Sequence, residues 1–324
     1  MHFLRKLNLF TSKPKTLLGI DIDDRACRFV ELSRTSEGYQ MHACVQKFFD
    51  EENLSKPFDW NDDACSAYLQ HIVLESNFLT KKIALALPHS RVLFKTMELD
   101  KTLQDSEIMI QIKEKITQYF NYPLADLLID FEILGTSKNH IGLNEIQYVA
   151  AKLPEVVSRI KAFKAAQLKT VFVETDSHAL KRAASFFLLR KYSDISLVVV
   201  MHVGVGHVLW LILEEQRVIH IGKETIPINP GDLKSFAQTI WQVFLKNNVG
   251  KLPQFILLCG LGISSEFLET LQSQTQIKTA VLDILAEFNS RVSHRQDLFN
   301  SEEGQTYRSE EFVIAAGLAM RAAI

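Results

Sequence analysis

The sequence contains few cysteines, and no two of them lie close together in the chain. A structural zinc site or a redox motif needs closely spaced cysteine pairs, so this pattern argues against both. We expect all the thiols to be reduced and buried in the folded chain. The four cysteines are Cys27, Cys44, Cys65 and Cys259.

The sequence also lacks an excess of charge of either sign. Its 36 Lys and Arg residues nearly balance 38 Asp and Glu residues, which gives a net charge of −2. Such a chain has no long-range field that would attract nucleic acid, so we do not expect a dedicated DNA-binding protein. With 47% hydrophobic and 23% charged residues the composition is that of a globular protein. A length of 324 residues corresponds to about two folded units.

One uncharged run, residues 195–213, is 19 residues long and must be tested as a membrane span. It holds His202 and His207, and Gly204 and Gly206 divide it in the middle. Valines on both sides of these glycines favour two strands joined by a turn, so we predict a buried β-hairpin. Residues 1–10 are too short and too interrupted by charge for a secretory signal. We expect a frayed terminus there, with a short amphipathic arm that contacts a membrane or a partner as the alternative.

The first 190 residues alternate strand and helix patterns. Hydrophobic runs between polar turns predict strands, and apolar residues at helical spacing predict helices, with Asp59 and Asp176 as candidate caps. The expected strands are residues 16–22, 26–33, 39–48, 82–87, 92–99, 127–134, 146–152 and 168–173. The expected helices are residues 61–75, a helix from Thr102 to about Asn121, 154–166 and 176–190.

The rest of the chain repeats a similar order. After the hairpin at 195–213 we expect a strand at 217–222, a turn at 227–230 and a helix at 232–247. A buried strand at 255–259 leads through Gly260 and Gly262 into a helix that Ser264 caps. A final helix is expected at 309–323, with two acidic residues near its positive end.

Several segments in this order resemble the actin-like ATPase fold and, within it, the type IV pilus assembly protein PilM family, which is related to the division protein FtsA. The matching segments are residues 18–22 with 28–32, 173–183, 257–260 and 315–319. The resemblance implies an α/β fold of two ribonuclease H-like lobes. It places the first lobe at 1–190, with an inserted α/β subdomain at about 83–153. It places a reduced second lobe at 191–324, where a connection of about ten residues replaces the outer subdomain.

The resemblance also implies where a nucleotide would bind, and the residues at these positions are unfavourable for it. The first phosphate turn holds Asp23 and Asp24, whose carboxylates repel a triphosphate unless a metal ion intervenes. The second turn lacks the expected carboxylate. We therefore predict no catalytic residues, no metal site and no cofactor, with ATP and magnesium as the alternative. His202 and His207 are expected on opposite sides of an extended strand, and not as a metal pair. The degenerate nucleotide-site positions are Asp21, Asp23, Asp24, Arg25, His202, Gly204, Gly206, Gly260 and Gly262.

The function implied by the resemblance is a cytoplasmic scaffold of type IV pilus or DNA-uptake assembly, held at the inner membrane through a partner. That partner is the cytoplasmic tail of a PilN-like membrane protein, with other pilus assembly proteins as further contacts and no direct nucleic acid. A groove between the first lobe and its inserted subdomain would hold the tail as an extended peptide. An active ATPase and an FtsA-like division protein are the alternatives. The expected groove residues are Leu85, Leu87, Val92, Phe94, Ile112 and Ile116.

Overall fold

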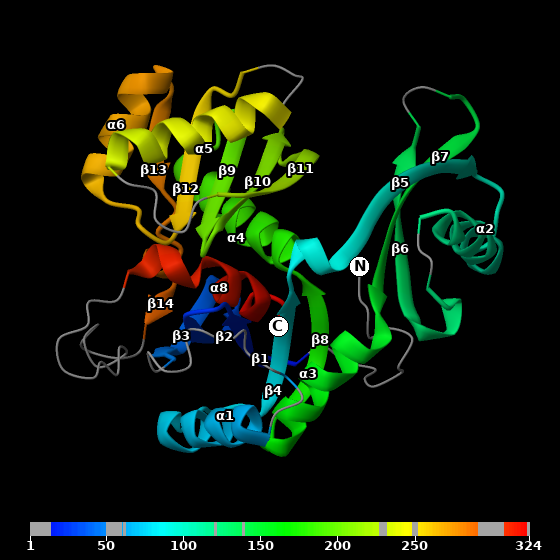
Figure 1. Cartoon of the computed structure of the whole chain (residues 1–324), viewed down its shortest axis with the longest axis horizontal. Coiled ribbons are helices and arrows are strands. Elements are labelled where there is room, and N and C mark those ends of the chain that lie inside the picture. Colours follow the sequence, from blue (N-terminus) through cyan, green and yellow to red (C-terminus); the bar gives the residue numbers. More distant parts are fainter. Residues whose placement is uncertain are drawn as a thin grey trace.

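The computed structural model describes residues 14–49, 60, 63–119, 122–137, 140–226, 232–247, 252–290 and 308–322. Two large sheets lie in separate lobes, and a smaller third sheet projects from the first lobe (Figure 1). Within the described residues, no helix has the length and apolar character needed to cross a membrane. The expected arm at residues 1–10, the cap at Asp59 and the turn at 227–230 lie outside the described part of the chain.

The first lobe is built on a six-stranded sheet with the order β14-β3-β2-β1-β4-β8. Strands β1, β2 and β3 form two consecutive antiparallel hairpins. Strand β4 pairs in parallel with β1 on one side and with β8 on the other. Helices α1 and α3 pack on one face of this sheet. The bounds are β1 Thr16–Ile22, β2 Ala26–Thr35, β3 Gly38–Phe48, α1 Asp63–Ser76, β4 Lys82–Leu87, α3 Leu153–Ala165, β8 Lys169–Thr175 and β14 Asn289–Ser290.

The second lobe has a five-stranded sheet with the order β11-β10-β9-β12-β13, which repeats the topology of the five strands from β3 to β8. The predicted hairpin is confirmed, because β9 and β10 pair in antiparallel across a two-residue turn. Helices α5 and α6 cover one face. The bounds are β9 Leu197–Gly204, β10 His207–Glu214, β11 Arg217–Thr225, α5 Leu233–Asn247, β12 Phe255–Gly260, α6 Ser265–Thr275 and β13 Lys278–Val281. Residues 226–232 connect β11 to α5.

The inserted subdomain is an antiparallel sheet with the order β5-β7-β6, covered on one face by α2. The bounds are β5 Val92–Asp100, α2 Asp105–Thr117, β6 Leu127–Thr136 and β7 Leu143–Lys152. The insert therefore follows β4, and the expected start near residue 83 is corrected. That strand pairs with β1 and β8 and belongs to the sheet of the first lobe.

Two helices lie between the sheets, α4 Asp176–Lys191 and α8 Val313–Ala319. Although α8 follows the second lobe in sequence, it packs on β1, β2 and β4, so the boundary of 191–324 is corrected for this helix. The packing is close. A Cβ atom on Gly19 would lie 2.0 Å from the Ala315 carbonyl oxygen, and one on Gly317 would lie 2.1 Å from that of Ala179. All four cysteines are free and buried, as predicted.

Candidate functional site

A cleft of about 770 Å³ lies between the two lobes. The β1–β2 turn, residues 88–94, the start of α4, the β9–β10 turn and the end of β11 all contribute to it. Five of the positions predicted for a degenerate nucleotide site line this cleft and therefore lie close together. They are Asp21, Asp23, Asp24, His202 and Gly204.

The β1–β2 turn is closed on itself by the carboxylate of Asp23. Its Oδ1 accepts hydrogen bonds from the backbone N–H groups of Arg25 at 2.7 Å and Ala26 at 2.9 Å. Backbone N–H groups that converge in a turn are the donors that would hold a phosphate anion. Here the chain supplies its own anion to these donors. The sequence led us to expect that Asp23 repels a phosphate. In the structure its carboxylate also occupies the backbone N–H groups that a phosphate would need.

The second oxygen of Asp23 binds a buried arginine. Arg28 is 2% exposed, and its Nη1 donates to Asp23 Oδ2 at 2.6 Å while its Nη2 donates to Glu311 Oε2 at 3.1 Å. Gln46 Nε2 also donates to that glutamate oxygen at 3.0 Å. Burial alone would raise the pKa of Asp23, but the Arg28 charge and the hydrogen bonds outweigh it and lower the pKa. This ionic chain fixes the β1–β2 turn to the segment before α8.

The β9–β10 turn is covered by a histidine of its own. The ring of His207 lies over Gly204, where a Cβ atom would be 2.3 Å from His207 Cε1. The Nδ1–H of this ring donates to the Val205 carbonyl oxygen at 3.0 Å. Burial and the nearby Lys223 charge lower the pKa of His207, so the ring is neutral at physiological pH. A neutral ring therefore occupies the space above the second turn.

The expectation that His202 and His207 face opposite sides is wrong. They lie on paired antiparallel strands, where Gly204 is opposite His207 and His202 is opposite Leu209, so both imidazoles emerge on one face. Both line the cleft. Burial lowers the pKa of His202 to about 3. Across the residues that the structure describes, no group of three or more His, Cys, Asp or Glu side chains is placed to hold a metal ion.

Further charged groups in the cleft were not predicted from the sequence. Lys223 Nζ lies 4.0 Å from Asp176 Oδ2, and Asp176 Oδ1 accepts the N–H of His89 at 2.9 Å. Burial raises the pKa of Asp21 to about 7 and also raises that of Asp176, while it lowers the pKa of Lys223. The position of Asp176 at the start of a predicted helix was a usable signal. The sequence of β11, a half-exposed strand, contained no comparable signal for Lys223.

The cleft lining carries more acidic side chains than lysines and arginines. Carboxylates outnumber cations among the cleft residues, and the turn donors that would offset the phosphate charge are occupied. The lining carboxylates are Asp21, Asp23, Asp24, Asp176 and Glu224, and the lining cations are Arg91 and Lys223.

The remaining nucleotide-site predictions, Arg25, Gly206, Gly260 and Gly262, are not among the residues that line the cleft. Gly260 serves packing. Its φ of +97° is left-handed, a Cβ atom there would lie 2.1 Å from the Val203 carbonyl oxygen, and the Leu261 N–H donates to that oxygen at 2.8 Å. Gly260 therefore lets the chain leave β12 toward α6 while it stays in close contact with β9.

A second cavity of about 420 Å³, called here the α3 groove, lies between the ends of β1 and β4 and helix α3. It adjoins the cleft, because Ile22, Asp23, Asp24, Ala86, Pro88 and Arg91 line both. Its apolar lining is Ile20, Ile22, Trp60, Leu85, Ala86, Pro88 and Phe163. Its polar lining includes Arg91, Glu155, Ser158 and Arg159.

The groove predictions are corrected in part. Leu85 lines the α3 groove, whereas Val92 and Phe94 line the interlobe cleft. Leu87, Ile112 and Ile116 are buried in cores and line neither cavity, because α2 turns its apolar stripe onto the sheet of its own subdomain. The side chains of α3 were missed, since a helix with one apolar face gives no sign that its edge borders a cavity.

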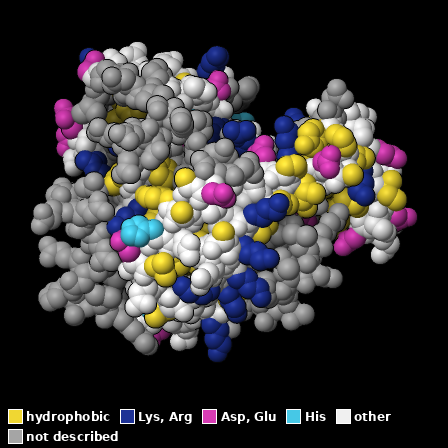
Figure 2. All heavy atoms as spheres, turned by 60° about the horizontal axis from the view of Figure 1, so that its bottom comes forward, with side chains coloured by type: hydrophobic (Ala, Val, Ile, Leu, Met, Phe, Trp, Pro, Cys, Tyr) yellow, Lys and Arg dark blue, Asp and Glu magenta, His cyan; other side chains and the backbone are white. Residues whose placement is uncertain are grey.

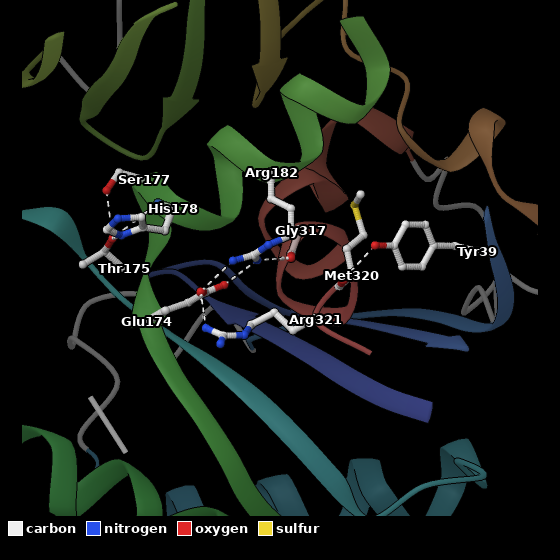
Figure 3. Close-up of polar contacts among 9 residues, drawn as sticks. All are labelled: Tyr39, Glu174, Thr175, Ser177, His178, Arg182, Gly317, Met320 and Arg321. Atoms are coloured by element: carbon white, nitrogen blue, oxygen red, sulfur yellow. Dashed lines mark hydrogen bonds and ion pairs between the residues drawn. The ribbon is translucent and has the colours of Figure 1, made fainter. Parts of the chain in front are cut away.

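An ionic network holds α8 against β8 and α4 (Figure 3). Glu174, only 2% exposed, accepts from Arg182 Nη1 at 2.6 Å and from Arg321 Nη1 at 2.7 Å. Arg182 also donates to the Gly317 carbonyl oxygen at 2.5 Å. Burial would raise the pKa of Glu174, but the two arginines lower it to about 2. The start of α4 is capped by Thr175, whose Oγ1 accepts the His178 N–H, and not by Asp176 as predicted.

The two large sheets share the same order of five strands, and the first hairpin turn of each sheet borders the cleft between the lobes. This arrangement defines a protein of the actin-like ATPase fold. The solved "PilM-PilN type IV pilus biogenesis complex" contains a chain of this fold with a TM-score of 0.74 and 15% identity, over 96% of this chain and 99% of that one. A family model for the type IV pilus assembly protein PilM matches residues 19–225, and the chain belongs to this family.

Two further structural matches have TM-scores below 0.5. One is a protein with an actin-like ATPase fold and unknown function from Bacteroides thetaiotaomicron, with a TM-score of 0.48 and 13% identity over 84% of this chain and 93% of that one. Another is the ethanolamine utilization protein EutJ from Carboxydothermus hydrogenoformans, with a TM-score of 0.49 and 11% identity over 98% and 94% of the two chains.

Proposed function

We propose that this chain is a scaffold of type IV pilus assembly that holds the cytoplasmic tail of a PilN-like membrane protein in the α3 groove. The observation that carries the proposal is this groove, a cavity with apolar and charged lining that lies between the ends of β1 and β4 and helix α3 in the first lobe. Membership of the PilM family and the similarity to a chain of a PilM-PilN complex support the choice of partner. The scaffold would act in the cytoplasm and reach the inner membrane through this partner.

The groove has the chemistry that a short extended peptide needs. The half-buried Ile22 and Ala86 belong to strands and the half-buried Ser158 belongs to a helix, so the surface of the groove is fixed before any partner arrives. A preformed apolar site avoids the entropy of ordering a loop on binding. The guanidinium of Arg159 lies 4.9 Å from the Trp60 ring and donates to the Glu155 carbonyl oxygen, which holds one charged edge in place. A tail with apolar side chains between polar ones would match this lining.

The interlobe cleft supports a scaffold that does not hydrolyse ATP. The carboxylate of Asp23 occupies the donors of the first turn, and the ring of His207 covers the second. Both groups would have to move before phosphates could approach the turns. The volume of the cleft, about 770 Å³, is the observation that favours the alternative of an active ATPase. Phosphate release with magnesium ATP tests it, and turnover that the Asp21→Ala change abolishes would establish that alternative.

Calorimetry without nucleotide tests the peptide proposal. Ser158 lies in α3 on the groove, where its hydroxyl donates to the carbonyl oxygen of Glu155, three residues earlier. A Ser158→Arg change places a long charged side chain in the groove and should weaken binding of a PilN-like tail peptide at least about tenfold, or about 1.4 kcal/mol.

A matched control is available on α6. Ser273 is exposed and makes the same kind of bond to the carbonyl oxygen three residues earlier, at Thr270. Ser273→Arg should leave the affinity unchanged. Equal affinities for both variants and the unmodified chain would place the peptide elsewhere, and failure of the unmodified chain to bind would refute the proposal.

A further inference from the structure

Exposed lysines gather where β4 and β8 begin and α3 ends. Lys82 and Lys169 are partners in the register of the two strands, and the Lys169 N–H donates to the Lys81 carbonyl oxygen at 2.7 Å. Lys161 and Lys164, three residues apart in the second half of α3, lie on one side of that helix. Figure 2 shows Lys and Arg side chains gathered on this side of the molecule, with few acidic side chains between them. The lysine face comprises Lys81, Lys82, Lys161, Lys164 and Lys169, all exposed.

The exposed Glu75 at the end of α1 pairs with Lys47 and His71, and the two segments that carry the lysine face hold no acidic residue. Neither residues 77–87 nor residues 156–173 contain Asp or Glu. The carboxylate of Glu31 is close by, but it is 1% exposed and accepts the backbone N–H groups of Leu79 and Thr80 from beneath. It therefore holds the loop before Lys81 in place without presenting its charge at the surface. All charged residues of these two segments are therefore Lys or Arg, on a chain whose net charge is −2.

Exposed leucines accompany the lysines. Leu79, two residues before Lys81, is 72% exposed, and Leu74 in the last turn of α1 is 69% exposed. Neutral apolar side chains among cations are the pattern of a surface that meets the headgroup region of a bilayer, where the apolar groups reach the acyl boundary. A surface that binds only nucleic acid phosphates gains nothing from exposed leucines.

We propose that the lysine face lies directly against a membrane that carries anionic lipids. The orientation agrees with the proposed partner site, because Lys161 and Lys164 share α3 with Ser158 and Phe163, which line the α3 groove. Thirteen residues of helix span about 20 Å, so both sites lie close enough to act together. Lipid contact and tail binding would then reinforce each other through effective concentration. The lipid contact goes beyond the proposed function and stands on different residues.

Co-sedimentation of the whole chain with vesicles, in the absence of any partner peptide, tests the proposal. We expect binding to phosphatidylcholine vesicles that contain about one third phosphatidylglycerol, and much weaker binding to phosphatidylcholine alone. Each lysine near such a surface contributes about fivefold to the partition coefficient, so Lys81→Gln with Lys164→Gln should lower it about 25-fold. Binding should also weaken as salt rises above about 0.1 M.

The control is a double change of equal charge on the insert, Lys101→Gln with Lys113→Gln, both of which are exposed. It should leave vesicle binding within about twofold of the unmodified chain. Equal binding to both kinds of vesicle, equal loss in both double variants, or binding to duplex DNA without binding to anionic vesicles would overturn the proposal. Because the assay contains no peptide, its failure would leave the tail-binding proposal standing, and the reverse also holds.

Discussion

The carboxylate of Asp23 offers the sharpest test of how the first turn is built. An Asp23→Ala change removes two hydrogen bonds from backbone N–H groups and one from a guanidinium, at 2.7, 2.9 and 2.6 Å. It leaves the buried Arg28 with Glu311 but without this carboxylate. Removing one partner of a buried ion pair costs about 3–5 kcal/mol, and because the Asp23 side chain is 21% exposed, the lower end, about 3 kcal/mol, applies.

Urea unfolding at neutral pH, followed by fluorescence of the three tryptophans, measures this loss. The neighbouring Asp24 is the control, because it is exposed and lies in the same turn, so Asp24→Ala should change the free energy of unfolding by less than about 0.5 kcal/mol. Adding Arg28→Met to Asp23→Ala removes the uncompensated charge, and the double variant should lose less than the sum of the single losses. A loss below about 1 kcal/mol for Asp23→Ala would refute this reading of the turn.

Two further predictions concern pH. Because the folded-state pKa of Glu174 is about 2, below its ordinary 4.5, the stabilisation it provides is present above about pH 4.5 and is lost as pH falls toward 2. Its full value is about 3 kcal/mol, and Glu174→Gln should flatten acid unfolding over this range; an unchanged acid transition would contradict the proposed network. For Asp21 the sign is reversed, since burial raises its pKa to about 7 and its ionisation destabilises the fold as pH rises from about 4 to 7. Asp21→Asn should therefore stabilise the chain at pH 8 by at least about 1 kcal/mol and have little effect at pH 4, and an equal effect at both values would contradict the buried carboxylate.

Local patterns in the sequence predicted most elements of the fold. The strands at 16–22 and 82–87 have the predicted bounds, because an apolar run bounded by polar residues or proline leaves little freedom in where a strand ends. The hairpin at 195–213 followed from two glycines in an uncharged run. The position of α8 on the first lobe depends on contacts between residues 19 and 315, which a local pattern does not contain.

Fewer features of the candidate site followed from the sequence, because they depend on how separate segments meet in the fold. His202 and His207 were judged as if on one strand, although the predicted turn between them brings both to one face. Ile112 and Ile116 form an apolar stripe on α2, and such a stripe is compatible with either a peptide groove or a hydrophobic core. In the structure it packs in the core of the insert. The carboxylate of Asp23 was expected to repel an anion, whereas a turn can also bind its own aspartate.

A crystal structure of the chain with the tail peptide of a PilN-like protein and magnesium ATP tests the central claim most directly. We predict peptide side chains on Ile22 and Ala86 beside α3, and the carboxylate of Asp23 still bound to the N–H groups of Arg25 and Ala26. A triphosphate seated on those N–H groups, with Asp23 turned away and no peptide beside α3, would contradict it.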